Sequence, residues 1–412
     1  MQLHDEYNPE VPLVMHIDLN SCFATVEQQS RPMLRGRPVA IVNRRTEHTA
    51  IVTASYEAKA RGVTVGMKFK EAQVLCPDIV MLESDPAKYR FVYHKMLEIM
   101  NSYSAHVTMK SIDEGVIDFH QTTEAVRRQS LVGIGYEIKQ RLRDEIGRAM
   151  RCNVGIAPNR FLAKTAAGLH KPDGLDVIDA TNLRATLATL KLKGLTGIAD
   201  RNEERLNAVG IYTPLEFLDA SPETLHRMVF KSICGEQWHQ RLRGWEVDDV
   251  PHPLKTAGRQ YVLESNSLSR EQIVKRLHHL SEAVGRKIRS QKKAARGVMV
   301  YAKSYDRGYW HARRMAELPF SSDKAIYSVA RQLFLNAPDK IKEIGVTCYE
   351  LCDDNDPQLS LFGDQIAEEI RLTTMMDEIN NRYGERVIHS ADTLGTNNFL
   401  KQKIPFGGTR YL

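Results

Sequence analysis

The chain has 412 residues and a net charge of +6, and 42% of its residues are hydrophobic, which is enough for two to four small cores. It contains no apolar run long enough to span a membrane, and the acidic start MQLHDEYNPE lacks the apolar core of a signal peptide. The six scattered cysteines form no CxxC pair, so we expect free thiols, no zinc site and a reducing, cytoplasmic location.

A short apolar run near the N-terminus carries an acid at its end. Residues 11–19 are VPLVMHIDL, which is typical of a buried strand that delivers Asp18. A carboxylate at the end of a buried strand is costly unless it is paired or bound to a metal. Asp18 is therefore either a metal ligand or the N-cap of a following helix.

Two adjacent acids, Asp113 and Glu114, lie where one β-prone run ends and another begins. Adjacent side chains in a strand point to opposite faces, so these two converge only at a hairpin corner. We expect Gly115 to supply the backbone freedom for that corner. Converging acids repel each other unless a cation neutralises them, so the pair is either a divalent metal site or a solvated hairpin tip.

Together with Asp18, the pair would hold two divalent metal ions. That arrangement suits phosphoryl transfer, because one ion activates the attacking oxygen and the other stabilises the leaving group. Spacing alone leaves the metal site and its alternative, a capping Asp18 beside a surface hairpin, equally open.

The other elements follow from periodicity and turn residues. We expect helices at about 69–75, 87–100, 123–146 and 160–169, a strand at 152–157, short helices over 180–250, and a linker at VPHPLK. Residues 257–351 predict a β-α-β-β-α-β pattern with helices at about 270–291 and 323–335. A further helix is expected near 365–383.

Positive charge is concentrated in one region. Residues 251–350 contain 19 Lys and Arg against 9 Asp and Glu, a balance of +10, so the other 312 residues sum to −4. The densest cluster comprises Arg286, Lys287, Arg289, Lys292, Lys293 and Arg296. Since opposite charges are absent from this run, it favours contact with phosphates over a solvated helix face.

Four blocks of the sequence resemble the signature of Y-family translesion DNA polymerases. They are HIDLNSCFATVEQ at 16–28, TASYEAKARGV at 53–63, KSIDEGVIDF at 110–119 and NVGIAPNRFLAKTAAGLHKPDGLDVID at 153–179, in the family's order and spacing. The resemblance implies an α+β multidomain fold shaped like a right hand. Its palm is a mixed sheet with helices, its fingers are small, its thumb is helical, and its little finger has the β-α-β-β-α-β pattern.

The resemblance also divides the chain into domains. It implies a palm at 12–23 and 85–179, fingers at 24–84, a thumb at 180–250, a linker at 251–256, a DNA-binding little finger at 257–352 and a tail at 353–412. The thumb contains a helix-hairpin-helix-like motif whose turn amides would bind backbone phosphate. Its usual second glycine is replaced by Ala199, which leaves that contact open.

The implied function is low-fidelity, template-directed DNA synthesis past damaged bases, in DNA repair and the SOS response, with a mutator effect. Asp18, Asp113 and Glu114 match the family's catalytic metal ligands, and the Leu19 carbonyl adds one oxygen. The resemblance implies Mg²⁺ as the cofactor, two ions per site, with Mn²⁺ as a substitute. It also implies primer-template DNA and deoxynucleoside triphosphates as the partners, bound by a monomer.

Other residues match the family's nucleotide contacts. Phe23 matches the steric gate that excludes a 2′-hydroxyl, and Tyr56, Lys59 and Lys171 match the residues that bind the triphosphate. The family usually has arginine at the position of Lys59, and lysine lacks its bidentate fork. We expect Arg61 to compensate.

A second motif follows the predicted little finger. QLSLF at 358–362 resembles the bacterial sliding-clamp-binding motif, in which Leu361 and Phe362 would fill an apolar pocket while Gln358 binds at its rim beside Leu359. The alternative is a strand that returns to the core, which the acidic and glycine-ended flanks disfavour.

The branch within the family and some alternatives stay open. SYEA, NRFLAK and HKPDG resemble the polymerase IV type, whereas EAKA and the internal clamp motif resemble the UmuC type, which would imply UmuD′ and RecA-type activators. A catalytically silent adaptor that binds DNA and the clamp is the main alternative function. The retained acids argue against it, and the gate and basic region argue against a two-metal nuclease or a cyclase.

Overall fold

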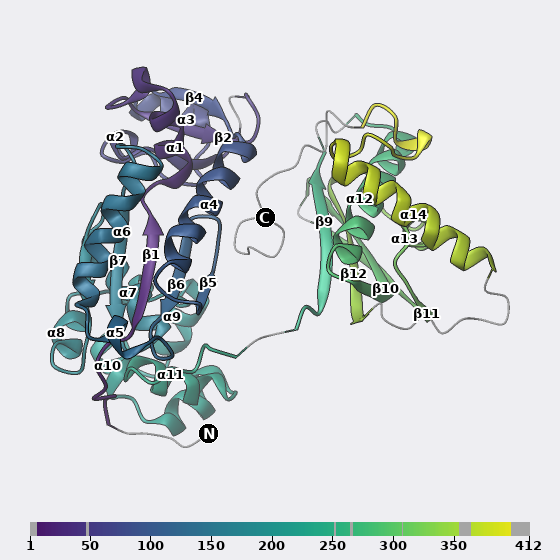
Figure 1. Cartoon of the computed structure of the whole chain (residues 1–412). Coiled ribbons are helices and arrows are strands. Elements are labelled where there is room, and N and C mark those ends of the chain that lie inside the picture. The colour runs from purple at the N-terminus through teal and green to yellow at the C-terminus, as the bar shows by residue number, and fades with distance from the viewer. Residues whose placement is uncertain are drawn as a thin grey trace. The chain divides into compact units, whose positions relative to one another are not determined.

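The computed structural model describes residues 6–46, 49–250, 253–263, 267–306, 308–353 and 364–396. Contacts divide the chain into two compact units, the first of which ends at Val250 (Figure 1). Each unit has its own hydrophobic core. Within the described residues, no helix has the length and apolarity that a membrane crossing requires.

The first unit is built on a five-stranded sheet with the order β5-β6-β1-β7-β8. The strands are β1 (Val14–Leu19), β5 (Val107–Met109), β6 (Glu114–Asp118), β7 (Cys152–Ala157) and β8 (Leu175–Val177). The central strand β1 pairs antiparallel with β6 on one side and β7 on the other. Its apolar sequence fits this position, because both faces of a central strand are covered.

The alternation of side chains divides β1 between two cores. Met15 and Ile17 belong to the core that includes residues of α4 (Pro86–Asn101) and α6 (Leu131–Glu145). Val14 belongs to the core that includes α7 (Arg160–Leu169), so the even-numbered residues of β1 share the α7 face. The sheet is therefore sandwiched between helices on both faces (Figure 1).

The helix predicted over 123–146 is wrong as a single element. The structure has α5 (Glu124–Arg127) and then α6, which begins after Ser130. The Ser130 hydroxyl accepts a hydrogen bond from the Gly133 backbone N–H at 3.3 Å, and this N-cap interrupts the helix. The expected α3 (Phe69–Leu75), α7 and β7 have the predicted bounds.

Two smaller substructures complete the first unit. A three-stranded sheet, β3-β2-β4, comprises β2 (Val39–Val42), β3 (Ile51–Ala54) and β4 (Val80–Glu83), with α1 (Cys22–Ser30), α2 (Tyr56–Lys59) and α3 nearby in the chain. The helical segment comprises α8 (Leu183–Ala188), α9 (Asp200–Asn207), α10 (Pro214–Asp219), a π-helix (Thr224–Phe230) and α11 (Cys234–Leu242). The Phe217 and Trp238 rings pack together in its core at 5.3 Å.

The second unit has an antiparallel sheet with the order β11-β10-β12-β9. Its elements are β9 (Thr256–Val262), α12 (Arg270–Arg289), β10 (Lys293–Ser304), β11 (Tyr309–Phe320), α13 (Asp323–Phe334) and β12 (Ile341–Asp353). This order confirms the expected β-α-β-β-α-β pattern. Apolar residues of both helices and of the strands form one core.

A C-terminal helix, α14 (Asp364–Tyr383), packs on the second unit near the end of α12 (Figure 1). Arg289 of α12 forms an ion pair with Asp377 at 2.7 Å and another with Asp323 at 2.7 Å, and Arg286 donates to Asn381 at 2.9 Å. The basic cluster therefore does have opposite charges beside it, contrary to the interpretation from the sequence. Asp377, the partner of Arg289, lies 88 residues further along the chain, so the local sequence did not reveal this ion pair.

A buried histidine makes the second unit sensitive to acid. His279 of α12 is 3% exposed, and its Nδ1 lies 2.8 Å from the Thr396 hydroxyl. Burial, together with the charge of Arg386, lowers the pKa of His279 to about 3 from its ordinary 6.5. The folded ring stays neutral at pH values at which the unfolded ring takes up a proton, so its contribution to stability is complete above pH 6.5 and lost as the pH falls toward 3.

At pH values below 6.5, we expect the free energy of opening of α12 to decrease as the pH is lowered. His279 should account for up to about 1.4 kcal/mol of this decrease per pH unit. Amide hydrogen exchange of α12, corrected for the intrinsic pH dependence of exchange, measures it. The variant His279→Gln keeps a polar group for Thr396 but does not titrate, and its profile should be flatter. Equal slopes for the two proteins would contradict the assignment.

Candidate functional site

The pairing of β1 with β6 brings two of the predicted acids together. Asp18 is the register partner of Glu114 in this antiparallel pair. Because side chains alternate along each strand, the even-numbered residues of both strands lie on the face that α7 covers. Asp18 and Glu114 are thus neighbours on one face, at the end of the sheet where the β5–β6 hairpin turns.

Glu114 is held by two cationic or polar partners that the sequence interpretation missed. Lys164 of α7 donates to both Glu114 carboxylate oxygens, at 2.7 and 2.9 Å, and His16 Nε2 lies 3.2 Å from Oε2. Burial alone would raise the pKa of Glu114, but the hydrogen bonds from His16 and Lys164 outweigh it and lower the pKa to about 2. Glu114 is therefore ionised at neutral pH.

Asp113 occupies the hairpin corner next to the pair. The Ser111 hydroxyl donates to Asp113 Oδ1, and the Asp113 carbonyl accepts from the Leu19 backbone N–H at 2.8 Å, which ties the corner to the end of β1. Burial and the charges of Asp18 and Glu114 raise the pKa of Asp113. The raised pKa means that the ionised form of Asp113 is disfavoured, and a nearby cation would stabilise that form.

Gly115 does not have the predicted role. It lies within β6, paired with Ile17, and not in the corner. A Cβ added to it would lie 2.6 Å from the Met109 sulfur and 2.9 Å from Met100 Cε. The glycine is required for space between these methionines, so the corner itself is formed by the preceding residues.

The donor atoms at this end of the sheet fit a divalent cation. One ligand atom each of His16, Asp18 and Glu114 lies within 4.8 Å of the others, and Asp113 contributes charge next to them. Carboxylate oxygens are the ligands that hard cations such as Mg²⁺ prefer. In this structure, two lysine ammonium groups compensate the negative charge of the acids. Lys171 Nζ lies 2.6 Å from Asp18 Oδ2, and Lys164 forms an ion pair with Glu114.

The residues predicted to bind a triphosphate gather beside Asp18. Lys59 Nζ donates to the Ser21 hydroxyl at 2.8 Å and lies 4.9 Å from the centre of the Tyr56 ring. Partial burial of Lys59 and the charge of Lys171 lower the pKa of the Lys59 ammonium. The two lysines are therefore close enough to act on one anion.

Arg61 does not take the compensating role expected of it. Its guanidinium is ion-paired with Asp78 and also contacts the Cys76 sulfur at 3.4 Å. The Asp78 carboxylate supplies the electrostatic partner that draws the side chain there, so Lys59 has no arginine substitute at this position.

Phe23, the predicted steric gate, lies at the start of α1, one turn after Asp18. It is 7% exposed, and its ring stacks on Tyr89 with 4.3 Å between centroids and 9° between planes. Tyr89 is fully buried and donates to Glu27 at 3.3 Å. The Phe23 ring is thus backed by a buried, hydrogen-bonded aromatic neighbour, which no local spacing in the sequence indicates.

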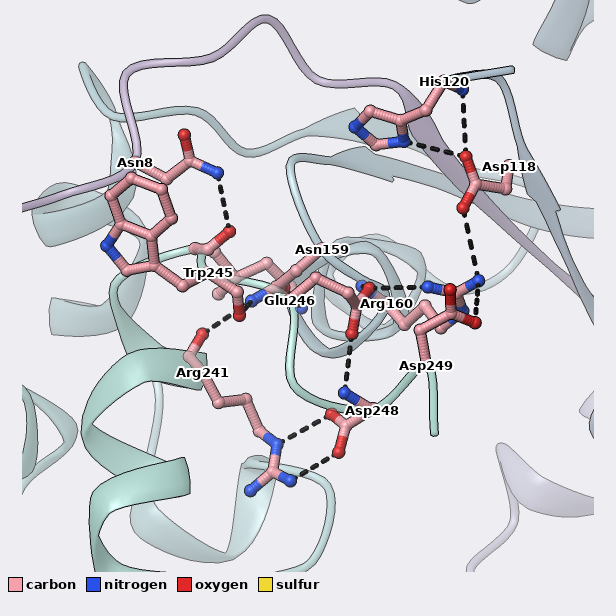
Figure 2. Close-up of polar contacts among 12 residues, drawn as sticks. Asn8, Asp118, His120, Asn159, Arg160, Arg241, Trp245, Glu246, Asp248 and Asp249 are labelled. Carbon is pink, nitrogen blue, oxygen red and sulfur yellow. Dashed lines mark hydrogen bonds and ion pairs between the residues drawn. The ribbon is translucent and has the colours of Figure 1, made fainter. Parts of the chain in front are cut away.

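The other end of α7 is anchored to the end of the helical segment. Figure 2 shows Arg160 between Asp118, Glu246 and Asp249, at 3.2, 2.9 and 2.7 Å, and Asn159 donates to the Trp245 carbonyl at 2.9 Å. Arg160 is one helical turn before Lys164, so the two lie on the same face of α7. One helix therefore links a predicted metal ligand to the last residues of the first unit.

The predicted clamp-binding residues Gln358, Leu359, Leu361 and Phe362 lie outside the described residues.

Comparisons with known proteins agree with this architecture. The model of the impB/mucB/samB family matches residues 17–168, and the model of that family's C-terminal domain matches residues 255–361. DNA polymerase IV of Moorella thermoacetica is 34% identical over 92% of this chain and 96% of its own length. DNA polymerase IV of Pelotomaculum thermopropionicum is 31% identical over 95% and 97%, and DNA polymerase IV 1 of Bacillus subtilis is 28% identical over 93% of each.

Solved structures share the fold. A Y-family DNA polymerase chimera of Dbh and Dpo4 superposes with a TM-score of 0.70 at 22% identity, covering 82% of this chain and 99% of the chimera. An insertion ternary complex of Dbh DNA polymerase gives a TM-score of 0.56 at 23% identity, covering 82% and 99%. Of the two branches that the sequence left open, the relatives favour the polymerase IV type. The chain belongs to the impB/mucB/samB family, the Y-family DNA polymerases of the polymerase IV type.

Proposed function

We propose that this DNA polymerase IV extends a primer by template-directed, metal-dependent nucleotidyl transfer, with Asp18, Asp113 and Glu114 as its metal ligands. The observation that carries the proposal is the register of Asp18 opposite Glu114, with Asp113 in the adjoining corner. Three acids gathered at one strand end are costly without a cation, which is the reason to assign them a metal site.

The chain's residues prepare the site for metal and substrate. Two Mg²⁺ ions, or Mn²⁺ as a substitute, when bound would activate the primer 3′-hydroxyl and neutralise the charge on the leaving group. Asp18, Asp113, Glu114 and the Leu19 carbonyl would hold them. Lys164 and Lys171 balance the acids beforehand, and we expect Lys171 to transfer from Asp18 to the incoming triphosphate.

Tyr56, Lys59 and Lys171 are proposed to bind the triphosphate, and Phe23 to reject ribonucleotides. The stack of Phe23 on the buried Tyr89 supports the second role, because the ring has no room to retreat from a 2′-hydroxyl. Selection of the base then depends on pairing and shape. Low fidelity and lesion bypass accord with the family.

The proposed partners extend beyond the substrates. Primer-template DNA and a nucleotide are supported by the similarity to ternary complexes of Dbh polymerase. We also propose that residues 358–362 bind a sliding clamp, and that the protein acts as a cytoplasmic, nucleoid-associated monomer in the SOS response. UmuD′ and RecA-type activators belong to the branch that the relatives disfavour.

The first prediction from this proposed function concerns the acid pair. The double variant Asp113→Ala plus Glu114→Ala should lose primer extension by roughly a thousandfold or more, about 4 kcal/mol of barrier, because the metal ligands are gone. The measurement is Mg²⁺-dependent extension of a primer on an undamaged template. Glu203→Ala plus Glu204→Ala removes an adjacent acid pair on α9 and should extend normally.

If the wild type binds DNA but never extends the primer, the protein is the silent adaptor instead. If the wild type shortens the primer, a nuclease is indicated.

The second prediction concerns the gate. Phe23→Ala should raise ribonucleotide incorporation relative to deoxyribonucleotide incorporation by roughly a hundredfold, since an apolar wall is what excludes the hydroxyl. Single-nucleotide insertion kinetics with matched ribo- and deoxyribonucleotides measure the ratio. Phe91→Ala, a truncation of an exposed phenylalanine on α4, is the control. An unchanged ratio in the Phe23 variant would show that another group discriminates the sugar.

The third prediction concerns the clamp motif. Leu361→Ala plus Phe362→Ala should reduce extension on clamp-loaded DNA by roughly a hundredfold through lost tethering, and leave extension without clamp unchanged. Leu372→Ala plus Met375→Ala removes two exposed apolar side chains of α14 and serves as the matched control. Equal stimulation of all three proteins by the clamp would refute the assignment.

A further inference from the structure

A small basic pocket lies next to the proposed triphosphate contacts in the first unit. It has a volume of about 280 Å³, and its lining includes Tyr56, Arg35, Arg148 and Arg151. This is below the size of pockets that take drug-sized molecules, and it suits a small polar ligand. Tyr56 lines the pocket and is also a proposed triphosphate contact, so the pocket adjoins the proposed triphosphate site.

The pocket has an excess of positive charge. Its three arginines are exposed, and among the described residues none of the three forms an ion pair with a carboxylate. Glu57 is the acid in the lining, and its carboxylate accepts a hydrogen bond from the buried Gln28 side chain at 3.1 Å. Arg148 and Arg151 therefore remain available to an anion that enters from outside, and Arg35 adds its positive charge beside them.

The walls of the pocket are held in place by hydrogen bonds. The Arg35 guanidinium donates to the carbonyls of Gln28 and Gln29, each at 3.2 Å, near the end of α1. The loop that carries Arg148 and Arg151 is tied down twice, because Ala149 N–H donates to the Gln29 side chain at 2.9 Å and the Arg151 carbonyl accepts from Asn20 N–H at 2.9 Å.

A glycine makes the first of these ties possible. Gly147 has φ +151°, and a Cβ there would lie 2.1 Å from Gln29 Nε2. Both ends of the arginine-bearing loop are thus fixed before any ligand arrives, and such preorganisation reduces the entropic cost of binding.

We propose that Arg35, Arg148 and Arg151 form a product site for the inorganic pyrophosphate that leaves the nucleotide. The inference rests on the proposed polymerase function. In that reaction the primer 3′-oxygen bonds to the α-phosphorus, the bond from that phosphorus to the bridging oxygen breaks, and the electron pair of the broken bond stays on pyrophosphate, while the 3′-hydroxyl proton passes to solvent water. Arginine forks bind phosphate oxygens in pairs, and they would draw the newly charged product past Tyr56.

The test compares Arg148→Ala plus Arg151→Ala with the wild-type full-length protein. The readouts are inhibition of primer extension by added inorganic pyrophosphate and the rate of pyrophosphorolysis, both with Mg²⁺. We expect the variant to bind pyrophosphate at least about tenfold more weakly, since the loss of even one charge-assisted hydrogen bond has about that effect and two arginines are removed. Its KM for the nucleotide should change about twofold at most, since the triphosphate contacts remain.

Two further variants sharpen the test. Arg148→Lys plus Arg151→Lys keeps the charge without the fork and should recover part of the pyrophosphate affinity. Arg127→Ala plus Arg128→Ala removes an exposed arginine pair elsewhere in the first unit and should resemble the wild type.

Unchanged inhibition by pyrophosphate in the alanine variant, with normal forward extension, overturns the product site and leaves the polymerase function intact. Equal loss of pyrophosphate and nucleotide affinity overturns it as well, because the arginines would then bind the substrate triphosphate. A wild type that neither extends nor degrades the primer refutes both proposals.

Discussion

The antiparallel pairing of β1 with β6 is the constraint on which the site depends. It sets Asp18 opposite Glu114, and the hydrogen bond from Leu19 N–H to the Asp113 carbonyl fixes the corner that holds the third acid. A slip of one residue in this pairing would move every side chain of the strand to the other face of the sheet. The apolar residues of β1 oppose such a slip, since Met15 and Ile17 would then leave their core.

The concentration of negative charge at this strand end requires compensation in the protein without metal. Lys164 and Lys171 provide it, and they come from α7 and from the turn that follows it. α7 is itself anchored through Arg160 to Asp118, Glu246 and Asp249. The helix α7 therefore connects the chain segment near residue 249 with Glu114, a proposed metal ligand.

Much of the fold was predictable from local patterns. Apolar periodicity predicted β7, α3, α7 and the order of elements in the second unit, because each of these segments is regular and bounded by turn residues. Spacing alone left the role of Asp18, Asp113 and Glu114 open, and it was the resemblance of the sequence blocks around them that marked all three as one proposed site.

Most of the failures of prediction involve partners distant in the chain. Lys164 lies 50 residues from Glu114, and Asp377 lies 88 residues from Arg289, so no local spacing indicates either pair. Gly115 was misread because the methionines that crowd it come from α4 and β5. The break before α6 was missed since a serine N-cap resembles any other polar residue within a helical period.

The short segment between β1 and α1 carries residues with several proposed roles. Asp18 and Phe23 are separated by one turn, and Ser21 between them adopts a left-handed backbone at φ 45° while its hydroxyl accepts from Lys59. Such a conformation is costly for a residue with a side chain, by roughly 1–2 kcal/mol, so the surrounding contacts must enforce it. The proposed sugar gate and the proposed metal ligand then share one short segment of backbone. Evolution or engineering that alters one of them through this corner will tend to disturb the other, whereas changes to Tyr89, on a separate helix, offer a way to adjust the gate alone.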